Sequence, residues 1–124
     1  MLFRSNDDFA DATVVGGLPY TDSVDTTAAT TETSDPDPSC VAAANTKTVW
    51  YKFTPGGDGT VTADTYGSSY NTVLSAWTGS PGAFVEEACD GLGAQSAISF
   101  SVTGGTAYHF MAAKYGTGSG GALV

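Results

Sequence analysis

The chain has 124 residues, which suits one domain better than two. Its 13 acidic and 4 basic residues give a formal net charge of −9. This charge argues against nucleic-acid binding, because phosphate contacts require clustered Lys and Arg, and it also argues against an anionic membrane surface. The 16 glycines and abundant Thr and Ser, without long helix-forming stretches, favour an all-β fold. No apolar run approaches the ~20 residues of a membrane-spanning helix, so we expect no membrane span.

The first third of the chain predicts little regular structure. Residues 6–12 form a polar entry with Phe9 as its apolar anchor, and residues 13–15 predict a short strand before two glycines. Residues 25–47 are rich in Thr, Ala and Pro, and each Pro favours an extended residue before it. We expect this stretch to be a long crossing loop tied down by Cys40.

From residue 49 onward, apolar and polar residues alternate as they do in half-buried strands. Val49, Tyr51 and Phe53 alternate with Trp50 and Lys52, which predicts that the first three face the core and that Trp50 faces the opposite side. Further strands are predicted at 60–65, 73–77, 84–88, 98–102 and 108–112, with a last one beginning near the C-terminal end. About eight short strands separated by turn residues favour a jelly-roll-like antiparallel β-sandwich, with residues 1–124 as a single module.

The two cysteines, Cys40 and Cys89, lack the spacing of a zinc motif, and only His109 could join them as a strong ligand. In an exported domain they are expected to form one disulfide, whereas in a cytosolic protein they would be two small buried thiols. Residues 1–4 lack the apolar core of a signal peptide. We therefore expect an excised piece of a larger secreted protein whose signal lies upstream.

The sequence offers no catalytic constellation, and we predict that the chain is not an enzyme. His109 lies in the middle of a predicted strand, where an ordinary strand residue is expected. Glu86 and Glu87 are adjacent, so in a strand they point to opposite faces and cannot pair as acid and base. The segment 116–120 has Gly rather than Ser at its centre and cannot serve as a nucleophile elbow.

Five segments, in their order and spacing, resemble the bacterial pre-peptidase C-terminal domain and its relatives. They are Asn6–Phe9, Val49–Thr54, Gly59–Val61, Thr65–Leu74 and Gly104–Tyr108. The resemblance implies a jelly-roll-like β-sandwich found beside secreted peptidases, glycoside hydrolases and surface adhesins. Some modules of this kind bind carbohydrate or matrix proteins, and some carry calcium.

The chain departs from that family at several positions. Asn71 stands where relatives often have Asp, and Cys89-Asp90-Gly91 replaces an Asn-Asp-Asp run, which weakens the case for calcium. Relatives with extra cysteines have no counterpart for them at Tyr66 and Pro81. The resemblance therefore leaves Cys40 and Cys89 as the pair that forms a bond.

Sugar binding requires exposed aromatic faces that stack on pyranose C–H groups, with polar side chains around them. The candidate ligand-binding residues are Trp50, Tyr66, Tyr70, Asn71, Trp77 and Tyr115. Packing is the competing role for the two tryptophans, because relatives in the resembled family also carry an aromatic residue at the strand end where Trp77 stands, and because the 25–47 loop could cover Trp50. The candidate oxygen donors for a structural calcium are Asp7, Asp8, Asp64 and Asp90. No cofactor is required by this interpretation.

The sequence thus predicts a non-catalytic carbohydrate-binding or adhesive accessory module of a secreted, extracellular bacterial protein. Its expected partners are a polysaccharide or a cell-surface or matrix target, together with covalently linked domains of the parent protein. Two alternatives stay open: a structural spacer or folding module attached to a secreted enzyme, and a module that binds proteins or hydrophobic surfaces. A truncated last strand would leave an open sheet edge, at which a dimer could form.

Overall fold

The computed structural model describes residues 12–16, 24–25, 40, 45–65, 72–79, 83–91, 96–115 and 122–123. All regular structure in these ranges is β-strand. The strands are β1 (Thr13–Val15), β2 (Val24–Asp25), β3 (Asn45–Phe53), β4 (Gly59–Asp64), β5 (Thr72–Thr78), β6 (Val85–Asp90), β7 (Ala97–Val102), β8 (Tyr108–Tyr115) and β9 (Ala122–Leu123). None of these ranges contains a helix long and apolar enough to cross a membrane.

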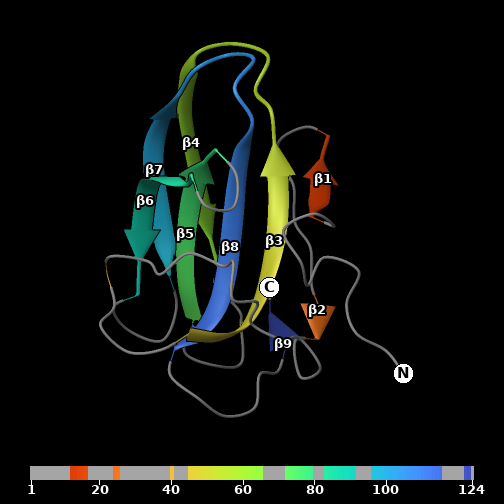
Figure 1. The fold of residues 1–124 in the computed structure, drawn as a ribbon, viewed down its shortest axis with the longest axis vertical. Coiled ribbons are helices and arrows are strands. Elements are labelled where there is room, and N and C mark those ends of the chain that lie inside the picture. Colours follow the sequence, from red (N-terminus) through yellow and green to blue (C-terminus); the bar gives the residue numbers. More distant parts are fainter. Residues whose placement is uncertain are drawn as a thin grey trace.

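The strands are arranged in one large and two small sheets (Figure 1). The large sheet has the order β1-β3-β8-β5-β6, in which β3, β8, β5 and β6 are antiparallel neighbours and β1 pairs with β3 in parallel. β4 and β7 form an antiparallel pair, and so do β2 and β9. The six longer strands, β3 to β8, therefore build two antiparallel sheets, with β4 and β7 behind the large sheet in Figure 1.

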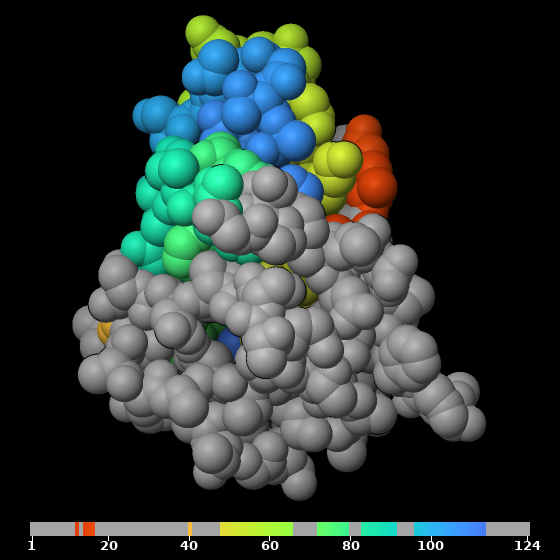
Figure 2. Space-filling view, in the orientation of Figure 1, coloured from red at the N-terminus to blue at the C-terminus, as the bar shows by residue number. Residues whose placement is uncertain are grey.

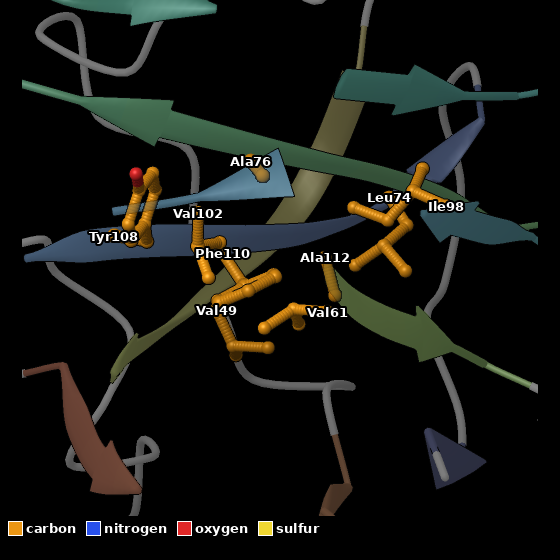
Figure 3. Packing of buried hydrophobic residues seen from close by; sticks show 9 residues of the cluster. All are labelled: Val49, Val61, Leu74, Ala76, Ile98, Val102, Tyr108, Phe110 and Ala112. Carbon is orange, nitrogen blue, oxygen red and sulfur yellow. The ribbon is translucent and has the colours of Figure 1, made fainter. Parts of the chain in front are cut away.

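The two antiparallel sheets pack face to face over an apolar core, as in a β-sandwich (Figure 3). β-Branched and aromatic side chains supply this core, which suits strands because such side chains pack well on a pleated surface. The larger sheet and the β4–β7 pair contribute nine buried residues: Val49, Val61, Leu74, Ala76, Ile98, Val102, Tyr108, Phe110 and Ala112. The alternation that predicted Val49 in the core is confirmed, as is the alternation of buried Ile98 and Val102 with exposed Ser99 and Ser101.

The opposite face of the larger sheet is also buried. Trp50, Trp77 and Met111 form a second apolar cluster, against which Ala12 and Phe84 pack. The Phe84 ring stacks on Trp50 with 5.7 Å between ring centroids and meets Trp77 edge-on at 5.9 Å. The central strands β5 and β8 are therefore buried on both faces, whereas the alternation of the sequence predicts strands with one solvated face.

One end of the sandwich is closed by two turns, residues 54–58 and 103–107, which connect β3 to β4 and β7 to β8. The Gly105 amide donates to the Pro55 carbonyl (2.8 Å), and the Gly104 amide donates to a carboxylate oxygen of Asp58 (2.8 Å). A Cβ on Gly104 would lie 2.7 Å from the Gly57 Cα, so the two turns approach backbone to backbone. Figure 2 shows them side by side at the top of the molecule, and we call this the turn end.

Candidate functional site

The opposite end, which we call the loop end, is where β4 and β6 finish and β5 and β7 begin. The strand registers place these termini together, because Asp64 of β4 pairs with Ala97 of β7 and Leu74 of β5 pairs with Asp90 of β6. β8 also finishes here, since Lys114 pairs with Thr72 at the start of β5. The connections 66–71 and 92–95 therefore both leave from the loop end.

Three hydroxyl side chains at the loop end form a buried network, which we call the hydroxyl clamp: Thr65, Thr72 and Ser96. Their exposed fractions are 2%, 0% and 0%, respectively. The Thr65 and Thr72 hydroxyls lie 2.6 Å apart, and the Thr72 hydroxyl donates to Ser96 Oγ at 3.1 Å. Ser96 Oγ donates to the Thr72 carbonyl at 2.8 Å. These bonds link the two layers, because Thr72 belongs to the larger sheet and the other two residues adjoin the β4–β7 pair.

Each hydroxyl group of the clamp has a hydrogen-bond acceptor within the clamp or on its backbone. Each hydroxyl has one proton, and the Ser96 proton goes to the Thr72 carbonyl while the Thr72 proton goes to Ser96 Oγ. The Thr65 hydroxyl then has two acceptors, the Thr72 hydroxyl at 2.6 Å and the Ser96 carbonyl at 3.4 Å, and its own oxygen accepts from the Ser96 amide at 2.9 Å. The Thr65 amide in turn donates to the Ser96 carbonyl at 2.9 Å, which continues the β4–β7 pairing. A buried polar group is costly unless it has a partner, so this satisfied network favours one arrangement of the strand ends.

Two further links hold the loop end together. A carboxylate oxygen of Asp90 accepts from the Ala97 amide at 2.8 Å and so joins the end of β6 to the start of β7. Cys40 and Cys89 form a disulfide with 5.8 Å between their Cα atoms, which attaches the segment before β3 to β6. The prediction of this bond is confirmed, and a disulfide is consistent with an extracellular location.

The structure places Trp50 and Trp77 in the buried cluster on the face of the larger sheet that points away from β4 and β7, not at an exposed position suited to stacking on a sugar. Trp50 is fully buried, and Trp77 is 5% exposed. The Trp77 indole N–H donates to the buried Ser75 hydroxyl at 2.7 Å, so its polar group also has a partner inside the protein. These two rings therefore act in packing, the competing role that the sequence left open for both.

Three of the other predicted ligand-binding residues, Tyr66, Tyr70 and Asn71, lie outside the described residues. Tyr66 directly follows Thr65 in the chain, and Asn71 directly precedes Thr72, so the segment that carries all three is attached to the clamp at both ends. Tyr115 is the last residue of β8 and pairs with Asn45 at the loop end. The chain thus attaches every predicted ligand-binding residue except the two tryptophans to one end of the sandwich.

The predicted calcium donors are divided between described and undescribed parts of the chain. Asp7 and Asp8 lie outside the described residues. Asp64 is exposed at the end of β4, and Asp90 accepts the hydrogen bond from Ala97. Within the described ranges, no group of three or more His, Cys, Asp or Glu residues could hold a metal ion.

His109 is the second residue of β8 and lies on the face that carries the tryptophans, between Lys52 of β3 and Trp77 of β5. Burial lowers the pKa of its imidazole below the ordinary value of 6.5, and the positive charge of Lys52 lowers the pKa further. The neutral form is therefore favoured in the folded protein. Glu87 is exposed on β6 and accepts from the Thr78 hydroxyl at 3.1 Å, while its neighbour Glu86 is partly buried.

The hydroxyl clamp is the feature of this end that the sequence does not reveal. Isolated Ser and Thr residues beside turns usually cap or hydrogen-bond locally, and nothing in the spacing of Thr65, Thr72 and Ser96 distinguishes them from the many other hydroxyl residues of the chain. Their proximity depends on the pairing of strands far apart in the sequence.

The fold and the site define an all-β module with one internal disulfide and a buried polar network at its loop end. Searches with family models, curated proteins and solved structures find no match to this chain.

Proposed function

We propose that the chain is a non-catalytic carbohydrate-binding or adhesive module of a secreted bacterial protein, with a jelly-roll-like β-sandwich as its scaffold. The observation that supports this proposal most is the construction of the loop end. The clamp holds Thr65 and Thr72, which flank the segment that carries Tyr66, Tyr70 and Asn71, and the Asp90 link and the disulfide hold the neighbouring end of β6. Binding residues are commonly carried by loops on a rigid scaffold of this kind.

Binding would rest on tyrosine rings at the loop end. Tyr66, Tyr70 and Tyr115 would stack on the C–H faces of sugar rings, and Asn71 would hydrogen-bond to the hydroxyl groups. Each site would bind weakly, because an open surface excludes little water and immobilises side chains. A structural calcium is also proposed, with Asp7, Asp8, Asp64 and Asp90 as its candidate oxygen donors.

The described surface gives less support to a module for hydrophobic surfaces. Val14 and Val85 are the exposed large hydrophobic residues of the described part, at 69% and 57% exposure. They lie on β1 and β6, the opposite edge strands of the larger sheet, and so do not form one patch. A binding site for hydrophobic material needs a contiguous apolar area of several hundred Å².

The proposal is tested by a glycan array together with pull-down on insoluble polysaccharides, each run with calcium and with a chelator. Selective retention on one polysaccharide class is the expected result, and its loss with the chelator would assign a functional role to calcium. Absence of retention on every polysaccharide would favour the spacer, or a module that binds a protein target.

Variants then locate the binding surface. Tyr66→Ala, Tyr70→Ala and Tyr115→Ala are each expected to weaken retention about two- to tenfold, since one aromatic contact contributes roughly 0.5–1.5 kcal/mol. Val85→Ala is the matched control, because Val85 is exposed at the start of β6, near the turn end. Equal retention of all four variants would place binding elsewhere on the molecule.

A further inference from the structure

The hydroxyl clamp fixes both ends of the six-residue connection 66–71. Thr65 precedes this connection and Thr72 follows it, and their side-chain oxygens are 2.6 Å apart. Bringing the ends of a chain segment together costs conformational entropy, and here a direct hydrogen bond between the flanking residues holds them. Ser96 follows the neighbouring connection, 92–95, and bonds to both threonines.

We propose that Thr65, Thr72 and Ser96 are positioning residues for ligand binding at the loop end, with Thr72 at the centre because its hydroxyl and carbonyl bond to both other members. This inference rests on the proposed function and deepens it. The clamp holds Thr65 and Thr72, which flank the connection 66–71, and Ser96, which follows the connection 92–95, in fixed positions before the ligand arrives. Less conformational entropy is therefore lost on binding. Such preorganisation raises affinity without any contact between the clamp and the ligand.

The geometry distinguishes this role from general support of the fold. The clamp hydroxyls lie at strand ends, whereas the apolar core occupies the space between the two sheets. Removing the Thr72 hydroxyl deletes its two hydroxyl–hydroxyl bonds but leaves the Thr72 carbonyl as acceptor for Ser96 and the Thr65–Ser96 backbone bond in place. The effect should therefore be confined to the loop end.

Thr72→Val tests the proposal, because valine keeps the shape of threonine and lacks the hydroxyl. Thr72→Ser is the rescue variant, since it restores the hydroxyl without the methyl group. Thr62→Val is the matched control: Thr62 is an exposed strand residue of β4 whose hydroxyl bonds to Ser99 at 3.3 Å.

The first measurement is amide hydrogen exchange of the unliganded protein. Thr72→Val is expected to speed exchange at the Thr65 and Ser96 amides by about tenfold, the factor that corresponds to ~1.4 kcal/mol, and to leave the β3–β8 amides unchanged. Thr72→Ser and Thr62→Val should match the wild type. Unchanged exchange in Thr72→Val, or faster exchange throughout the protein, would overturn the local clamp.

The second measurement is affinity for the polysaccharide that retains the wild-type protein. Thr72→Val should bind roughly two- to tenfold more weakly, as expected for the net contribution of one hydrogen bond, with affinity restored in Thr72→Ser. Equal affinity for both variants, together with faster local exchange, would refute the positioning role and leave the proposed function intact. If the wild type binds no polysaccharide, the proposed function and the positioning role both fail, whereas hydrogen exchange still reports on the clamp itself.

Discussion

The disulfide between Cys40 and Cys89 is expected to be a major source of stability. The two residues are 49 positions apart, and the chain-entropy model assigns about 4 kcal/mol at 25 °C to a cross-link that closes a loop of this length. Single domains have net stabilities of about 5–15 kcal/mol, so the double variant Cys40→Ser/Cys89→Ser should be marginally stable. For a chain of 124 residues this loss corresponds to a decrease in Tm of about 15 °C.

Urea unfolding of the wild type and the double variant measures the effect. If the bond acts by restricting the unfolded chain, the variant should also have a larger m value, because its unfolded state is more expanded. Wild-type protein with its disulfide reduced is the control, and it should match the variant if the serines themselves cost little. A loss below about 1 kcal/mol with an unchanged m value would refute the entropic reasoning.

Three further predictions concern the buried polar groups and the turn end. His109→Gln should reduce the loss of stability on acidification. The folded-state pKa of His109 lies below its ordinary value of 6.5, so its contribution to the free energy of unfolding is complete above about pH 6.5 and is lost as the pH falls towards the folded-state pKa. Urea unfolding from about pH 7.5 to pH 5 measures this effect. Ser75→Ala should cost about 1–3 kcal/mol in urea unfolding, since it removes the acceptor of the buried Trp77 indole N–H. Gly104→Ala should cost about 1–3 kcal/mol in thermal unfolding, because its Cβ would lie 2.7 Å from the Gly57 Cα.

Each of these predictions has a matched control. Lys52→Met should reduce the same loss of stability on acidification, because removing the Lys52 charge brings the folded-state pKa of His109 closer to its ordinary value. Ser99→Ala, at an exposed position of β7, and Gly56→Ala, where an added Cβ meets nothing within 4 Å, should each change stability by less than about 0.5 kcal/mol. If the controls lose as much stability as Ser75→Ala and Gly104→Ala, buried partners and close backbone approach do not explain the losses.

Alternation along the chain predicted the strands from residue 49 onward and which face of β3 carries the core. It did not predict that β5 and β8 are buried on both faces, because Ser75 and His109 look like solvent-facing residues in a sequence. Burial of Ser75 is possible because it accepts a hydrogen bond from Trp77, and this partner cannot be assigned from alternation alone.

The pairing of strands that lie far apart in the chain was also not predictable from the sequence. The parallel pairing of β1 with β3 has no local signal, since three residues of ordinary strand composition can pair with many partners. β6 continues to Asp90, two residues beyond the predicted strand 84–88, and the Asp90 carboxylate accepts a hydrogen bond from the Ala97 amide at the start of β7. An acidic residue beside Gly91 is typical of a turn, so its use as a link between strands was not predictable from the sequence.

The path of the chain between the two sheets has a consequence for folding kinetics. The connections β3–β4, β4–β5, β6–β7 and β7–β8 all cross from one sheet to the other, and among the six longer strands of the described residues only β5 and β6 are neighbours both in sequence and in the sheet. Most native contacts therefore join distant parts of the chain, and a high contact order slows folding to the millisecond-to-second range. The β5–β6 hairpin is a local element from which assembly can start, whereas the pairing of β4 with β7 has to close a loop that contains both β5 and β6.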